Sequence, residues 1–229
     1  MIMEWTKIND DTYTYDEGGV RFFLLTGGES ALLIDSGMNT KNVREFAAQV
    51  TSLPLRLFNT HADPDHTGGN GEFDEVMMNP AEFVNYRLPH PSQKMIPVFD
   101  GDTIDLVGRV LRAIALPGHT PGSTALLDTA SGMLFSGDPV QDGHIFMFGT
   151  MRELSAYVLS LKRLLTFADS IKEIYPCLGT CPVKPDIIEK LIDGAERVER
   201  GEVEYKTADK FGQKIRVYDI GAAVLLGNE

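Results

Sequence analysis

The stretch that decides the fold is His61-Ala62-Asp63-Pro64-Asp65-His66-Thr67-Gly68-Gly69, in which four metal-binding side chains fall within six residues. It directly follows the apolar run Leu55-Arg56-Leu57-Phe58-Asn59-Thr60, which is typical of a β-strand. Two imidazoles and two carboxylates on one short loop are donors that suit a divalent cation. Of the five histidines in the chain, a third, His119, lies in the turn Pro117-Gly118-His119-Thr120-Pro121-Gly122. The stretch therefore predicts a metal site at the end of a strand.

Length and composition indicate a folded protein with a sizeable core. The chain has 229 residues, of which 43% are hydrophobic, enough for one large domain or two small ones. A net charge of −12 argues against affinity for nucleic acid or an anionic membrane surface. The sequence lacks a run of 18 apolar residues, and its first residues lack the layout of a signal peptide, so a cytoplasmic location is expected.

Apolar periodicity predicts strands with helices interspersed between them. The expected strands cover residues 13–15, 20–26, 31–34, 55–60, 75–78, 103–106, 110–116, 123–128, 133–136, 174–175, 203–205, 215–218 and 222–226. Helices are expected after a cap at Asn39 or Thr40, over 80–86, after a capping box of Thr150 and Glu153, and from Pro185 to Gly201. This order suggests two sheets with helices outside, in a single domain over residues 1–229.

Taken in order with Ser136-Gly137-Asp138, these motifs resemble the signature of the metallo-β-lactamase-fold superfamily. That signature is His-x-His-x-Asp-His-x-Gly-Gly, followed by a distant His, an Asp and a last His. The resemblance spans nearly the whole chain and implies an α/β fold, a four-layer αββα sandwich of two mixed β-sheets with helices outside. It places the metal site at the edge between the sheets, with the metal ligands at His61, Asp63, Asp65, His66, His119 and Asp138.

The resemblance further implies one or two divalent metal ions, which are zinc, iron or manganese. The first ion would be bound by His61, Asp63 and His119. The second would be bound by Asp65 and His66, with Asp138 able to bridge both.

The chain departs from the signature at two positions. Asp63 replaces the second histidine, and the added negative charge weakens the Lewis acid and suits iron or manganese. Leu178 stands where the last histidine is expected, so one metal position loses a protein ligand. Cys177 or Cys181 can replace that ligand as a thiolate, although two packed thiols are the alternative.

The two remaining histidines have simpler interpretations. His144 follows Asp138 by six residues and can reach the mouth of the site, or it is a solvated loop residue. His90, between two prolines, is expected to be an ordinary loop residue.

The expected function is hydrolysis of a small ester, thioester, lactone or amide by a metal-bound water. Asp65 is the candidate catalytic residue, because its carboxylate can orient or deprotonate that water. One alternative is a non-haem diiron redox protein that needs an external electron donor, since a carboxylate at the position of Asp63 is a feature of the flavodiiron branch. The other is a non-catalytic member that binds metal or ligand, for which the motivation is Leu178.

The expected partner is a small-molecule substrate, with neither nucleic acid nor membrane and with the oligomeric state left open. The segment Pro139–Met151 carries Ile145, Phe146, Met147 and Phe148 but neither Lys nor Arg. As a pocket wall it would favour an apolar or neutral substrate group, and core packing is the alternative interpretation. Phosphate recognition usually needs Arg or Lys, so phosphoesters and RNA are disfavoured.

Overall fold

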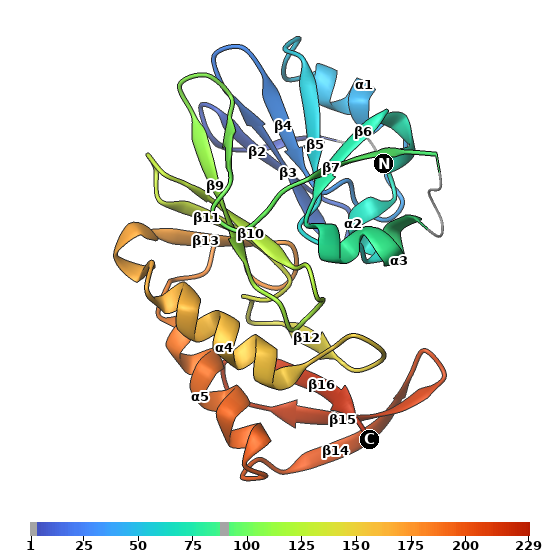
Figure 1. Ribbon diagram of the computed structural model, residues 1–229, viewed down its shortest axis with the longest axis vertical. Coiled ribbons are helices and arrows are strands. Elements are labelled where there is room, and N and C mark those ends of the chain that lie inside the picture. Colours follow the sequence, from blue (N-terminus) through green and yellow to red (C-terminus); the bar gives the residue numbers. More distant parts are fainter. Residues whose placement is uncertain (1–3, 88–91) are drawn as a thin grey trace.

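The N-terminal half of the chain forms a seven-stranded sheet whose strands follow the order of the sequence (Figure 1). The computed structural model describes residues 4–87 and 92–229. The strands are β1 (Thr6–Asn9), β2 (Thr12–Asp16), β3 (Arg21–Thr26), β4 (Ala31–Ile34), β5 (Leu55–Phe58), β6 (Glu75–Met78) and β7 (Lys94–Pro97). Strands β4 to β7 run parallel, so their carboxyl ends meet at one edge of the sheet.

A second sheet lies face to face with the first, in the order β13-β11-β10-β9-β8. Its strands are β8 (Thr103–Asp105), β9 (Val110–Ala115), β10 (Thr124–Asp128), β11 (Met133–Gly137) and β13 (Glu173–Pro176). The core between the two sheets includes Phe23 and Phe58 from the first and Phe135 and Tyr175 from the second. Strands buried on both faces explain why β4 and β10 read as continuous apolar runs.

Helices cover the outer faces of both sheets. Helices α1 (Val43–Ala48) and α3 (Phe83–Arg87) pack on the first sheet, and α4 (Leu154–Leu165) and α5 (Ile187–Glu199) pack on the second. The short helix α2 (Pro64–Thr67) carries Asp65 and His66 of the histidine motif, and 3₁₀ turns cover Asn70–Glu72, Pro80–Glu82 and Ala168–Ser170. The four-layer αββα sandwich expected from the sequence is confirmed.

A third, four-stranded sheet extends beyond this sandwich, to the right of α4 and α5 in Figure 1. Its order is β12-β16-β15-β14, with bounds β12 (His144–Met147), β14 (Tyr205–Lys210), β15 (Gln213–Asp219) and β16 (Val224–Asn228). The sequence analysis expected two sheets and omitted this one, because it predicted no strand between residues 136 and 174, where β12 lies. Strands β1 and β7 were also missed, since both are short and lie at the edges of their sheet.

The helix starts differ from the expected caps. Glu153, not Thr150, caps α4, because its own carboxylate accepts a hydrogen bond from the Ser155 amide. Helix α1 starts after Asn42 rather than at Asn39 or Thr40, and its first amides are capped from a distant loop by the Glu72 carboxylate, 2.9 and 3.0 Å away. Capping by a residue that is far away in sequence leaves no local signal to read.

Helix α5 has 13 residues, and none of the helices in the described part of the chain combines the length and apolarity of a membrane span.

A buried ion pair joins the two main sheets. Arg109 is 5% exposed, and its Nε donates to Asp128 Oδ2 at 2.8 Å. The same guanidinium donates to the Asp11 carbonyl oxygen at 2.7 Å and to Thr12 Oγ1 at 2.8 Å. It therefore links the β1–β2 hairpin of the first sheet to β9 and β10 of the second.

We expect Arg109→Met to lower the free energy of unfolding by about 3–5 kcal/mol, because the Asp128 carboxylate stays buried without its cation. Urea denaturation measures the change. The matched control is Lys190→Met, which breaks an exposed ion pair with Asp186 and should cost less than about 1 kcal/mol. Equal small losses in both variants would show that Arg109 does not hold the sheets together.

Candidate metal centre

Loops at the carboxyl ends of strands from both main sheets bring the six predicted ligands together. His61 follows β5, His119 lies in the loop between β9 and β10, and Asp138 follows β11. Five of the six have donor atoms in two groups, each within 4.8 Å: His61, His119 and Asp138 in one, and Asp65, His66 and Asp138 in the other. A third group of this kind consists of Asp35, His66 and Cys177.

The distances within these groups are short and the imidazoles are fully buried. The Nε2 atoms of His61 and His119 are 3.2 Å apart, and Asp138 Oδ2 lies 3.5 Å from that of His119. Asp138 Oδ1 lies 3.3 Å from His66 Nε2, and Asp65 Oδ2 lies 3.5 Å from the same nitrogen. The Asp65 side chain is 29% exposed, so it forms the outer, accessible side of the group.

Hydrogen bonds at Nδ1 fix the orientation of all three rings. His119 Nδ1 donates to the Phe146 carbonyl at 2.9 Å, and His66 Nδ1 donates to Asp35 Oδ2 at 2.8 Å. His61 Nδ1 lies 3.0 Å from Thr60 Oγ1. Because the Thr60 hydroxyl donates its proton to Asp35, it accepts the hydrogen bond from His61 Nδ1. Carbonyl and carboxylate oxygens only accept, so Nδ1 of each ring carries a proton and its Nε2 is the nitrogen that faces the centre.

Asp35 is the buried anchor of this arrangement, and the sequence analysis missed it. Its carboxylate accepts from the Thr60 amide, the Thr60 hydroxyl and His66, and it is fully buried. Burial acts to raise the pKa of Asp35, but the His66 ring and the other donors hold it below its usual range. The sequence could have pointed to Asp35. It follows β4 as His61 follows β5, and these neighbouring parallel strands end at the same edge of the sheet.

Two further features position the ligand loops. The buried Glu82 carboxylate accepts from the Ala62 amide at 3.0 Å and the Gly122 amide at 2.6 Å, and so holds together the loops that carry His61 and His119. Gly118 has φ +137°, and a Cβ there would lie 2.4 Å from the Tyr157 backbone. Only glycine allows the His119 loop to lie this close to α4.

The bare side chains fit a divalent cation. Among the described residues, His66 Nε2 and Asp138 Oδ1 are buried and face each other at 3.3 Å without forming an aligned hydrogen bond, an arrangement in which a cation between them would satisfy both. Burial opposes protonation of His66, yet the Asp138 and Asp35 carboxylates raise its pKa well above the usual value. Burial likewise opposes ionisation of Asp138, but the histidines hold its pKa well below the usual range. The same negative field attracts a metal ion.

Asp63 has a partner that the sequence did not predict. Its Oδ2 lies 3.5 Å from Nε2 of both His61 and His119, while Arg152 Nη2 donates to its two oxygens at 2.9 and 2.7 Å. Arg152 lies 89 residues later, just before α4, and also donates to the His119 carbonyl. The guanidinium therefore offsets the negative charge that Asp63 adds to the site.

The candidates for the missing ligand lie elsewhere. Cys177 is buried, and its Sγ donates to Asp35 Oδ2 at 3.3 Å; burial raises the pKa of its thiol well above the usual value, which keeps it protonated. Cys181 is half-buried, and burial raises its pKa to about 11. Within the described residues, neither Cys181 nor the exposed His144 of β12 joins a metal-binding group. Leu178 packs against the core between the sheets, and His90 lies outside the described residues.

A cavity of about 450 Å³ opens above the centre. Asp63, Asp65 and Asp138 form its polar floor, and its wall is largely apolar, from Met38, Phe146, Phe148 and Phe211. Both interpretations of the Pro139–Met151 segment hold for different residues, because Ile145 and Met147 are in the core while Phe146 and Phe148 line the cavity.

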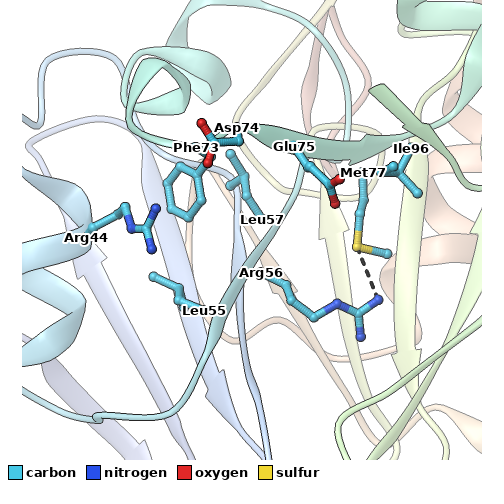
Figure 2. A pocket seen from close by; sticks show the side chains of 9 residues that line it. All are labelled: Arg44, Leu55, Arg56, Leu57, Phe73, Asp74, Glu75, Met77 and Ile96. Atoms are coloured by element: carbon cyan, nitrogen blue, oxygen red, sulfur yellow. Dashed lines mark hydrogen bonds between the residues drawn. The ribbon is translucent and has the colours of Figure 1, made fainter. Parts of the chain in front are cut away.

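A second cavity, of about 430 Å³, lies on the first sheet at α1 and β6 (Figure 2). Arg44 lies over the Phe73 ring, 5.3 Å from its centroid, and Arg56 contacts Met77 Sδ at 3.5 Å. Its lining, as labelled in Figure 2, shares no residue with the histidine and aspartate groups, so the chemistry belongs to the first cavity.

Comparisons with known proteins agree with this geometry. Residues 15–205 match the family model described as the metallo-beta-lactamase superfamily. The chain is 28% identical over 197 residues to the human protein named acyl-coenzyme A thioesterase MBLAC2, covering 68% of this chain and 71% of that one. It is 30% identical over 191 residues to thioesterase pkgB of Emericella nidulans, covering 80% of this chain and 52% of that one.

Among solved structures, a metallo-beta-lactamase from Pontibacter korlensis superimposes with a TM-score of 0.72 at 18% identity, over 85% of this chain and 99% of that one. That likeness concerns the fold. The family match covers most of the chain and includes every residue of the histidine and aspartate groups. The chain therefore belongs to the metallo-β-lactamase superfamily.

Proposed function

We propose that this protein is a metal-dependent hydrolase of acyl thioesters. The observation that carries the proposal is the convergence of three imidazole Nε2 atoms and the carboxylates of Asp65 and Asp138 beneath an apolar cavity. Two relatives whose names describe them as thioesterases support the choice of thioester among the possible carbonyl substrates.

In this proposal His61, His119 and Asp138 would hold one ion, and Asp65, His66 and Asp138 would hold a second. Asp63 lies beside His61, and Arg152 holds the Asp63 carboxylate in place. A divalent ion would supply Lewis acidity, which lowers the pKa of a coordinated water and polarises a carbonyl oxygen. The chain's own donors set how strong that acidity is, and a carboxylate-rich set makes it weaker than an all-histidine set.

A weaker Lewis acid favours a substrate whose leaving group departs readily. A thiol has a pKa near 8.5, so a thiolate leaves with less assistance than an alkoxide or an amine. In the hydrolysis, water adds to the carbonyl carbon, a C–O bond forms and the C–S bond breaks, which gives a carboxylic acid and a thiol. Asp65 faces the cavity and takes the proton from water, then returns it to the sulfur.

Thiol release from acetyl and octanoyl thioesters, with zinc, manganese or iron(II) supplied separately, tests the proposal directly. We expect turnover that depends on the added metal and stops with a chelator. Stable binding of metal without turnover of any thioester would favour a non-catalytic role instead.

Replacing Asp65 tests its place in proton transfer. We expect Asp65→Asn to lower kcat about 10²-fold or more, since the amide cannot accept the proton. The control is Asp193→Asn, which changes an exposed carboxylate on α5 and should leave kcat unchanged. Metal content is measured in parallel, and an unchanged kcat in Asp65→Asn would exclude Asp65 as the base.

The histidines test the first metal position. His61→Ala and His119→Ala should each weaken metal binding by more than about tenfold, because each removes a neutral nitrogen donor. Metal content after equilibration against a metal buffer is the readout, and thermal unfolding checks the fold. His144→Ala, which removes an exposed histidine outside the centre, should retain the wild-type metal content. Wild-type content in both ligand variants would refute the assignment.

The Asp63–Arg152 pair predicts how metal preference responds to substitution. Asp63→His should shift preference from manganese toward zinc, because it exchanges a carboxylate for an imidazole. The shift should be larger in an Arg152→Gln background, where the guanidinium no longer repels the ion. Competition between the two metals at equal free concentration measures the preference. If it stays the same in both backgrounds, Asp63 is not a ligand.

A further inference from the structure

The β14–β15 hairpin ends in a turn whose first residue is unusual. Lys210 pairs with Gln213, so the loop has two residues, Phe211 and Gly212, with φ +52° and +76°. Positive φ at both positions defines a type I′ turn, which favours Asn-Gly. A phenylalanine in this left-handed conformation is strained, and strain of this kind is often retained for function.

Phe211 is also 79% exposed, the largest value among the described large hydrophobic residues. Exposure of a large ring in a strained turn gains little for stability. We therefore looked for a functional reason for Phe211, and its place beside the cavity suggests one.

Phe211 reaches the wall of the cavity above the metal centre. Its ring centroid lies 6.2 Å from that of Phe146 and 6.3 Å from that of Phe148. Lys210 Nζ lies over the Phe146 and Phe211 rings, 4.7 and 5.7 Å from their centroids, which holds the hairpin tip against β12. In Figure 1 the hairpin curls beside the segment that follows β12.

Met38 enters the same cavity from the loop after β4 and is 50% exposed. The mouth of the cavity therefore has exposed apolar side chains from two segments, with Lys210 beside Phe211, while the three carboxylates lie at the floor. The family match ends at residue 205, so the turn belongs to the part of the chain beyond the shared pattern.

We propose that Phe211, with Phe146 and Phe148, binds the acyl chain of the substrate and makes this protein selective for longer apolar acyl groups. The inference rests on the proposed thioesterase function. A flexible apolar chain that enters from the mouth would cover these rings and remove them from water, while its carbonyl reaches the polar floor.

The test compares octanoyl and acetyl thioesters of N-acetylcysteamine, which differ only in the acyl group. Wild-type kcat/KM should be about tenfold or more higher for octanoyl, and Phe211→Asn should bring this ratio close to one. Phe211→Asn gives the preferred Asn-Gly turn, so its Tm should equal or exceed that of wild type. Phe211→Gly, which tolerates the same φ, serves as a second variant.

The matched control is Val107→Asn. Val107 and Gly108 have φ +64° and +81° in the β8–β9 hairpin, so this change relieves the same kind of turn outside the residues that line the cavity. It should leave the octanoyl-to-acetyl ratio at the wild-type value. A wild-type ratio near one, or a ratio that Phe211→Asn does not change, would overturn the inference.

A binding experiment separates this inference from the proposed function. Calorimetry measures how tightly the protein binds an octyl thioether of N-acetylcysteamine, which cannot be hydrolysed. If neither thioester is hydrolysed but the thioether binds and Phe211→Asn weakens binding about tenfold, the thioesterase proposal fails and the acyl site stands. If thioesters are hydrolysed but thioether binding is the same in both proteins, the acyl site fails and the thioesterase proposal stands.

Discussion

The buried carboxylate of Asp35 is the constraint on which the centre depends. An ionised group without solvent must be surrounded by donors, and this chain supplies them from the end of β5, from α2 and from the segment after β13. The hydrogen bonds that satisfy Asp35 are those that fix His66 directly and His61 through Thr60. Satisfying one buried charge therefore orients the rings of His61 and His66, while the Phe146 carbonyl orients that of His119.

Much of this could be predicted from the sequence, because the decisive signals are local. The candidate ligands can be read directly from the His61–Gly69 stretch and from the turn around His119. Alternating or continuous apolar runs indicate most of the strands. The partners that cross the fold could not be predicted in this way. Arg152 reaches Asp63 from 89 residues away, and Glu82 joins two loops that no local pattern connects. The third sheet escaped prediction because β12 pairs with β16 at the other end of the chain.

Different sheets supply the polar and the apolar parts of the site. The two main sheets supply the charged floor at their shared edge, and the third sheet supplies aromatic side chains above it. Arg152 connects the two, since it binds Asp63 in the floor and lies in the segment that follows β12 of the third sheet. A polar reaction centre beneath an apolar wall suits a substrate with a reactive carbonyl at one end and a hydrocarbon chain at the other.

The central claim is that the two groups that share Asp138 are adjacent metal sites. Anomalous X-ray scattering from crystals of the metal-loaded protein, at the absorption edges of zinc, manganese and iron, tests it most directly. The account predicts one peak in bonding contact with His61 Nε2, His119 Nε2 and Asp138, and a second with Asp65, His66 Nε2 and Asp138. Metal-loaded crystals with no anomalous peak at these nitrogens, or with the peak at other residues, would contradict it.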